Sequence, residues 1–150
     1  MSRGIRSVSR FILSALLCIT LAQAYLGVPG IAAQSGSLKV TVEYKGAGTV
    51  DKEHKLWIWL FDTPTIDESS EPVTTSSMAE NGGTASFDAL PETVYIAVCF
   101  DEKGGYDGTS GPPQSGSPVS IHGEAGAAKP VKTGSDTKVT VTFDDSMRMP

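Results

Sequence analysis

Short apolar runs follow one another along the chain from about residue 38 to residue 143. The run 38–44 alternates strictly, with apolar residues at even positions and polar residues at odd ones. A period of two is typical of a strand with one buried face and one wet face. The runs 56–61 and 94–100 are apolar on both faces. They therefore predict strands that are covered on two sides and lie centrally in a sheet.

Weaker strand patterns fill most of the remaining chain. They lie at 72–76, 84–88, 119–122, 129–132 and 138–143. Turn-forming residues separate these runs at Gly46–Gly48, Asn81–Gly83, Gly104–Gly105 and Thr133–Ser135. No segment shows the 3.6-residue period of a helix. The pattern predicts an all-β fold, a two-sheet antiparallel sandwich of about seven strands and immunoglobulin-like or transthyretin-like architecture.

Composition adds that the sandwich is one domain. The chain has 150 residues, of which 39% are hydrophobic and 19% charged, values that suit a single globular unit. Its 16 glycines and 9 prolines concentrate between the apolar runs, as a many-stranded protein with tight turns requires. We expect one domain over residues 34–150.

The first 33 residues read as a secretory signal segment. Three arginines at positions 3, 6 and 10 precede an uncharged apolar run from Phe11 to Leu21 and then small residues. Cleavage after Ala24 and cleavage after Ala33 both fit the pattern. The alternative is an uncleaved N-terminal anchor, because 11–33 is long enough to span a bilayer. The expected location is the periplasm or the extracellular space, with no membrane span once the segment is cleaved.

The net charge limits the candidate partners, and the cysteine content limits disulfide formation. Without the signal segment, nine basic and seventeen acidic residues remain, a net charge of about −8. We therefore expect no nucleic-acid partner. Cys18 lies within the predicted signal segment, so Cys99 is the only mature cysteine and no intramolecular disulfide is available. We interpret Cys99 as a small core residue.

One segment resembles a known family. Residues 83–91 read Gly-Thr-Ala-Ser-Phe-Asp-Ala-Leu-Pro and lead into Tyr-Ile-Ala-Val at 95–98. This stretch resembles the carboxypeptidase regulatory-like, or transthyretin-like, group of extracellular β-sandwich modules. The resemblance implies that Phe87 and Leu90 are buried and that a central strand follows; Thr93 stands where the family normally has glycine. It implies architecture and no particular activity.

The loop after the second apolar run is the candidate metal site. Asp101, Glu102 and Asp107 fall in the Gly-rich stretch 101–108, and Ca²⁺ prefers several oxygens held by a tightly turning backbone. Lys103 opposes a cation there, and the spacing differs from that of a helix-loop-helix calcium loop. An ordinary solvated turn is the alternative reading.

Two other features suggest binding surfaces. Trp57 and Trp59 share one strand face and could stack on sugar rings if exposed, although burial in the core explains a doubly apolar strand more simply. The Gly- and Pro-rich stretch 111–118 predicts a long surface loop that cannot pair within a sheet, and the role of 104–118 is open. His54 and His122 lie in no nucleophile motif, so no catalytic residue is assigned.

These observations leave three classes of function. The first is an exported non-catalytic module with a binding or structural role, whose partner is a protein or an envelope or extracellular polymer. The second is a Ca²⁺- or carbohydrate-binding domain that uses the loop 101–108. The third is an unrecognised enzyme. Oligomeric state is not readable, because the edge strands of a sandwich can pair with another chain.

Overall fold

The computed structural model describes residues 36–124 and 127–150, and this part of the chain contains ten strands and no helix. The strands are β1 (Gly36–Tyr44), β2 (Leu56–Phe61), β3 (Thr74–Met78), β4 (Thr84–Leu90), β5 (Thr93–Phe100), β6 (Val119–Ile121), β7 (Gly123–Glu124), β8 (Ala127–Ala128), β9 (Val131–Lys132) and β10 (Lys138–Phe143). The predicted all-β sandwich is confirmed. The strand predicted at 72–76 lies two residues later, as β3.

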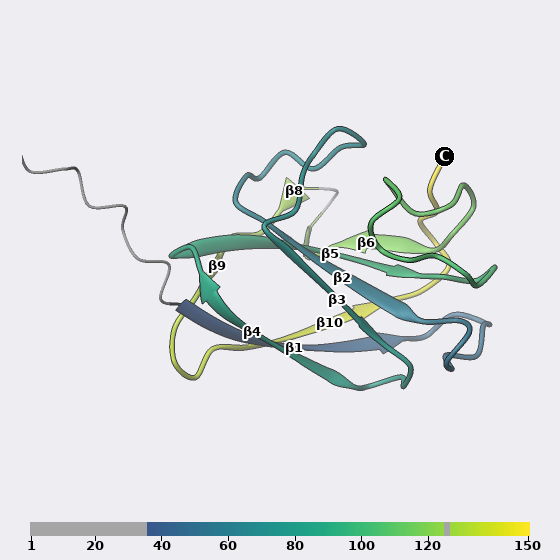
Figure 1. Cartoon of the computed structure of the whole chain (residues 1–150), viewed down its shortest axis with the longest axis horizontal. Helices are drawn as coiled ribbons and strands as arrows, with labels where there is room; N and C mark the ends of the chain where they lie inside the picture. The colour runs from purple at the N-terminus through teal and green to yellow at the C-terminus, as the bar shows by residue number, and fades with distance from the viewer. Residues whose placement is uncertain (1–35, 125–126) are drawn as a thin grey trace, which may run out of the picture. The chain divides into compact units, whose positions relative to one another are not determined.

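Two sheets face each other across the core (Figure 1). The smaller sheet has the order β10-β1-β4. The larger has the order β3-β2-β5-β6, with β9 pairing the start of β5, and β7 and β8 form a separate hairpin. As the sequence predicted, the two fully apolar runs β2 and β5 are adjacent and lie in the interior of the larger sheet.

The core between the sheets is built from alternate residues of the strands. Leu56, Ile58 and Leu60 of β2 point inward and are completely buried. They meet the even-numbered apolar residues of β1 and β5, in the alternation that the period of two predicts. The other side of β2 carries Trp57 and Trp59, which belong to a second apolar cluster outside the sandwich. The larger sheet therefore has apolar layers on both faces.

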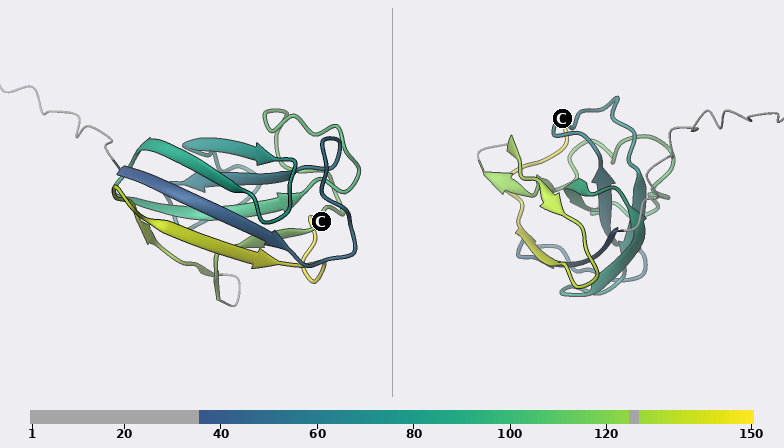
Figure 2. Two further views of the ribbon diagram at one scale, coloured as in Figure 1. Left: turned by 90° about the horizontal axis from the view of Figure 1, so that it is seen from below. Right: turned by 90° about the vertical axis from the view of Figure 1, so that its left-hand side faces the viewer.

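One pairing differs from the predicted antiparallel arrangement. β1 and β10 run parallel, in register from Lys39 opposite Lys138 to Tyr44 opposite Phe143 (Figure 2). The first and last strands of the sandwich thus lie side by side and point the same way. The alternation of apolar and polar residues within a strand does not show whether its neighbour runs parallel or antiparallel. Side chains point to alternate faces of the sheet in both arrangements.

A bulge interrupts the antiparallel pairing of β1 with β4. The register shifts between Gly36, which faces Leu90, and Leu38, which faces Phe87. Ala89 within this bulge has a φ of 55°, a left-handed conformation that residues with a Cβ rarely adopt. The bulge leaves both Phe87 and Leu90 buried although they are three positions apart. Their burial agrees with what the family resemblance implies.

The predicted signal segment, its two cleavage sites and the alternative anchor lie outside the described residues. Within 36–124 and 127–150, no helix has the length and hydropathy needed to cross a bilayer.

Candidate functional site: an apolar groove on the larger sheet

The floor of the candidate site is the outer face of β2 and β5. Trp57, Trp59, Phe61 and Cys99 form a buried cluster there, and all but Cys99 come from β2. The two indole rings stack with their centroids 6.3 Å apart. The ring of Tyr106 packs edge-on against Trp57, at 5.2 Å between centroids. This second layer exists because both faces of β2 are apolar.

Three segments outside the strands rise around this floor: the loop 62–73, the loop 104–118 and the C-terminal stretch 144–150. The first is held by Asp67, whose carboxylate accepts hydrogen bonds from Ser69 and Ser70. The second is held by Tyr106, whose hydroxyl donates to the Gly111 carbonyl. These local bonds give both loops fixed shapes without regular secondary structure.

The loop 104–118 approaches the floor so closely that one position needs glycine. Gly108 has a φ of 77°, and a Cβ built there would lie 2.2 Å from the ring of Trp57. Any side chain at residue 108 would therefore push the loop away from the sheet.

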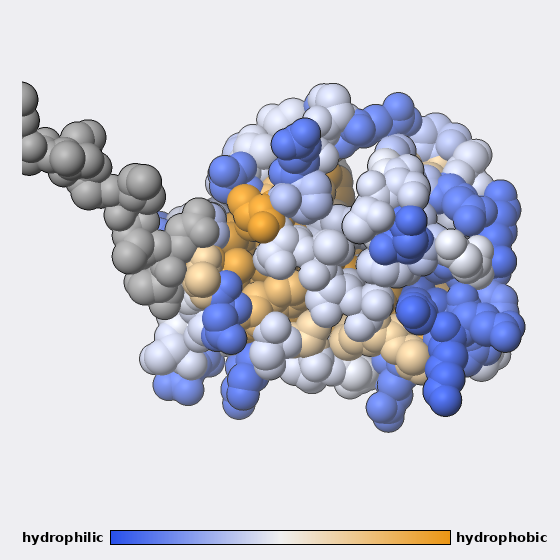
Figure 3. Space-filling view, in the orientation of Figure 1, coloured by the Kyte–Doolittle hydropathy of each residue, from blue (hydrophilic) through white to orange (hydrophobic). Residues whose placement is uncertain are grey.

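Between the walls lies a groove of about 780 Å³. Figure 3 shows this face hollowed between two raised loops, with hydrophobic residues inside the hollow. Its apolar lining includes Trp59, Phe61, Ile66, Pro72, Ala97, Tyr106, Pro112, Pro113, Val119, Ile121, Met147 and Met149. A concave, mostly apolar cavity of this volume is typical of ligand sites.

All charged side chains among the described residues that line the groove are acidic. Asp67, Glu68 and Glu71 line it, and no lysine, arginine or histidine is among the described residues that do. None of these three carboxylates takes part in an ion pair within the described chain. Hydrogen bonds from Ser69 lower the pKa of Asp67, so its carboxylate is ionised at neutral pH. The groove therefore offers negative charge beside an apolar floor.

The C-terminal stretch is fastened by Arg148. Its guanidinium donates to Glu102 Oε2 and to the Gly116 carbonyl, both at 2.6 Å, and lies 3.5 Å from Asp145. Backbone bonds join Met149 to Gly116 and Ser117 at 2.9 Å. Because neighbouring side chains of an extended segment point to opposite sides, Met147 and Met149 line the groove while Arg148 binds the loop.

The three predicted metal ligands have separate partners. Asp101 is buried, and its Oδ2 accepts the Tyr106 N–H at 2.9 Å. Glu102 pairs with Arg148. Asp107 caps its own turn by accepting the N–H groups of Thr109 and Ser110 and the Ser110 hydroxyl, and these bonds lower its pKa to about 2.

In the described part of the chain, no group of three or more His, Cys, Asp or Glu side chains is placed to hold a metal ion. The structure thus does not bring the three carboxylates together. Metal binding by the loop 101–108 stays a prediction.

A small set of buried polar atoms lies under the loop 104–118. Trp57 Nε1, Asp101 Oδ1 and Ser117 Oγ have no hydrogen-bond partner within the described protein. Burial, together with the nearby charge of Asp101, raises the pKa of the Cys99 thiol to about 12. Cys99 is thus a buried neutral thiol, which confirms its interpretation as a small core residue.

The tryptophan pair belongs to the core, as the sequence favoured. Trp57 and Trp59 are each only 7% exposed, so neither offers an open ring face to a sugar. Trp59 nevertheless lines part of the groove floor.

The prediction for residues 111–118 was partly wrong. Ser117 and Pro118 are buried, and the Pro118 carbonyl accepts the Phe100 N–H at 2.9 Å. Proline lacks a donor but keeps its acceptor, so this end of the loop does pair with the sheet.

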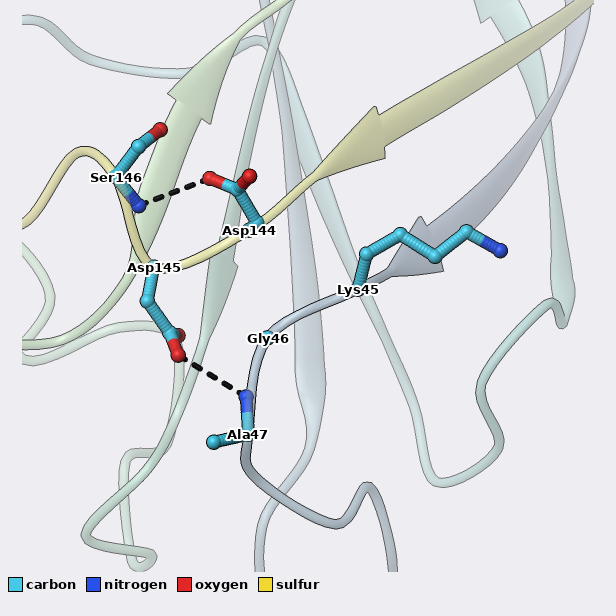
Figure 4. Close-up of a pocket in the computed structure, with 6 residues that line it drawn as sticks. All are labelled: Lys45, Gly46, Ala47, Asp144, Asp145 and Ser146. Atoms are coloured by element: carbon cyan, nitrogen blue, oxygen red, sulfur yellow. Dashed lines mark hydrogen bonds between the residues drawn. The ribbon is translucent and has the colours of Figure 1, made fainter.

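A second, open pocket lies where β1 and β10 end (Figure 4). Asp145 accepts hydrogen bonds from the Tyr44 hydroxyl and, at 3.0 Å, from the Ala47 N–H. Asp144 accepts the Ser146 N–H at 2.9 Å. Asp145 fastens the turn after β1 to the end of β10, whereas Asp144 bonds only within its own segment. The pocket is therefore a structural corner of the sandwich.

Comparison with known proteins identifies no family for this chain. No family model matches the chain, and no curated protein matches it. Among solved structures, it is similar to the pilus-presented adhesin Spy0125 (Cpa), at 18% identity and a TM-score of 0.33, covering 76% of this chain and 27% of that one. A cysteine-to-alanine mutant of the same adhesin gives 17% identity, a TM-score of 0.32 and coverages of 77% and 28%. The chain spans about a quarter of the adhesin's length.

Proposed function

We propose that this chain is an exported, non-catalytic binding module that takes an apolar ligand in the groove over the larger sheet. The observation that carries the proposal is the groove itself: about 780 Å³, floored by aromatic residues of β2 and walled by two loops and the C-terminal stretch. If these aromatic residues served only stability, the surrounding loops would pack over them and leave no cavity, because contacts between apolar atoms are favourable.

The distribution of exposed hydrophobic side chains supports this proposal. Among the described residues, the large hydrophobic side chains that stand exposed are Val73, at 39%, and Met147, at 45%. Met147 lines the groove, whereas Val73 is not among its lining residues. Met147 therefore adds exposed apolar surface to the concave site, as is typical of an interaction site.

The chemistry of the lining favours binding over catalysis. Carboxylates and hydroxyls line the groove, and the described lining has no histidine, lysine or cysteine. Catalysis there would have to use the carboxylates as acid, base or nucleophile, and Asp67 already accepts the hydrogen bonds that hold its own loop.

The expected location of the protein and its family resemblance are the remaining parts of the proposal. The signal-like segment 1–33 supports action in the periplasm or outside the cell, on a protein or an extracellular polymer. The sequence at 83–98 supports placement among the carboxypeptidase regulatory-like or transthyretin-like modules.

The experiment is a titration of the purified protein with Nile red, an uncharged apolar dye whose fluorescence rises in apolar sites. Ala97 of β5 lies on the floor opposite Trp59, so Ala97→Phe should fill the groove and abolish the rise. Thr140→Phe adds the same ring to the outer side of β10 and should bind dye like the wild type. Ala97→Leu replaces the first variant if thermal melting shows that it does not fold. Equal dye binding by all variants, or none by the wild type, would refute the proposal.

A further inference from the structure

The acidic wall of the groove points to a particular kind of ligand. We propose that the groove takes an extended polypeptide segment in which lysine or arginine stands next to apolar side chains. This inference rests on the proposed function, and it names the ligand class of the same site.

The first step is the sign of the charge. Asp67, Glu68 and Glu71 stand together on the loop 62–73 at the groove, and no positive side chain of the described lining balances them. Glu68 and Glu71 are exposed and take part in no ion pair within the described residues. Like charges this close repel an anionic ligand and attract a cationic one. A free acidic ligand is thereby disfavoured at this site.

The second step is the apolar part of the ligand. Phe61, Ile66 and Tyr106 belong to, or pack against, the aromatic cluster of the floor, and all three line the groove. Met147 and Met149 form part of the wall. Methionine side chains are flexible and polarisable, and they adapt to aliphatic and aromatic groups of varied shape. The floor therefore suits an apolar anchor side chain, with charged neighbours reaching the acidic wall.

The third step separates a polypeptide from a glycan. Sugar rings stack on exposed aromatic faces, whereas Trp59 is 7% exposed and its ring is tilted against Tyr106 at 6.0 Å between centroids. Prolines 112 and 113 add further apolar wall, which suits apolar side chains of a peptide. An extended peptide meets both requirements, because it presents apolar and charged side chains in alternation.

The experiment uses two capped hexapeptides that differ only at their second and fifth residues, Ac-Leu-Lys-Pro-Leu-Lys-Leu-NH2 and Ac-Leu-Glu-Pro-Leu-Glu-Leu-NH2, so that one is cationic and the other anionic. Each is titrated into the ¹⁵N-labelled protein, and chemical-shift changes give both affinity and location. We expect the lysine peptide to shift groove residues and to bind about tenfold more tightly, because two exposed charge pairs together change an affinity by about that factor. Higher salt should reduce this difference.

A charge-neutral double variant tests the acidic wall directly. Glu68→Gln with Glu71→Gln should reduce the lysine preference to the small remainder that the remaining carboxylate of Asp67 supports. Asp67 is not altered because it holds its own loop. The matched control is Glu53→Gln with Glu80→Gln, which removes the same charge at exposed positions outside the groove lining and should keep the preference.

The outcomes separate this inference from the proposed function. If Nile red binds in the groove but the two peptides bind equally or not at all, the cationic-peptide inference is wrong and the groove remains a binding site. If neither dye nor peptide binds, both proposals fail. A chitosan hexamer that shifts the groove residues where the lysine peptide does not would assign the site to a cationic glycan and overturn the inference.

Discussion

Asp101, Glu102 and Asp107 lie within seven positions of one loop, yet each has a different environment. Asp101 is buried because the alternation of β5 continues past its last residue and carries that side chain beneath the loop. Glu102 then points outward to Arg148, and Asp107 closes a turn of its own. The three carboxylates are close in sequence and lie in one loop. Their side chains point in different directions, so the carboxylate groups do not meet.

This divergence gives a prediction for Ca²⁺. Because the three carboxylates do not converge, Glu102 and Asp107 already have partners, and Ca²⁺ requires six or more oxygens, we expect the same melting temperature in millimolar Ca²⁺ as in EDTA. Differential scanning fluorimetry measures it. A Ca²⁺-dependent rise that Asp107→Asn abolishes, while Asp136→Asn at a distant exposed turn preserves it, would contradict this expectation and establish the loop 101–108 as a cation site.

At the scale of elements, the strands follow directly from sequence and the groove does not. Alternation located β1 and β10, since one buried face leaves a period of two, and continuous apolar runs located β2 and β5. The walls come from the loops 62–73 and 104–118 and the stretch 144–150, which show no strand or helix pattern. Ile66, Met147 and Met149 are single apolar residues in otherwise polar stretches. Their isolation is the feature of the sequence that could have pointed to an apolar site outside the strands. Their meeting depends on tertiary contacts that no local pattern encodes.

The bulge in β4 is a second element-level feature that sequence alone did not reveal, and it yields a stability prediction. Ala89 is exposed and has a φ of 55°, so its Cβ gains no packing and costs conformational energy. Ala89→Gly should increase the free energy of unfolding by about 0.5–1 kcal/mol, measured by urea denaturation.

The matched control for this bulge is Ala79→Gly. Ala79 is also exposed but has no positive φ, so glycine there should lower stability by making the unfolded chain more flexible. A loss of stability in both variants would mean that Ala89 is not strained.

At the scale of the whole molecule, the larger sheet separates two apolar layers, and each holds a buried weak acid with a raised pKa. Tyr44 lies in the inter-sheet core, stacked on Phe100 at 4.5 Å between centroids. Cys99 lies in the outer cluster beneath the groove loops. Burial raises the pKa of Tyr44 to about 12, with Asp145 adding to the effect, and the pKa of Cys99 also rises to about 12.

These two raised pKa values predict that the free energy of unfolding falls at alkaline pH, with a contribution from each apolar layer. The unfolded thiol and phenol ionise from their ordinary pKa values of 9.0 and 10.0, whereas the folded groups stay neutral up to about 12. Their contribution is therefore complete below pH 9 and falls as the pH rises toward 12. Urea unfolding at pH 8, 10 and 11 should show a decline that Cys99→Ala and Tyr44→Phe each make shallower. Because the two groups lie on opposite faces of the sheet, the double variant should combine both effects additively. A decline of unchanged slope in the double variant would show that other groups cause the alkaline loss.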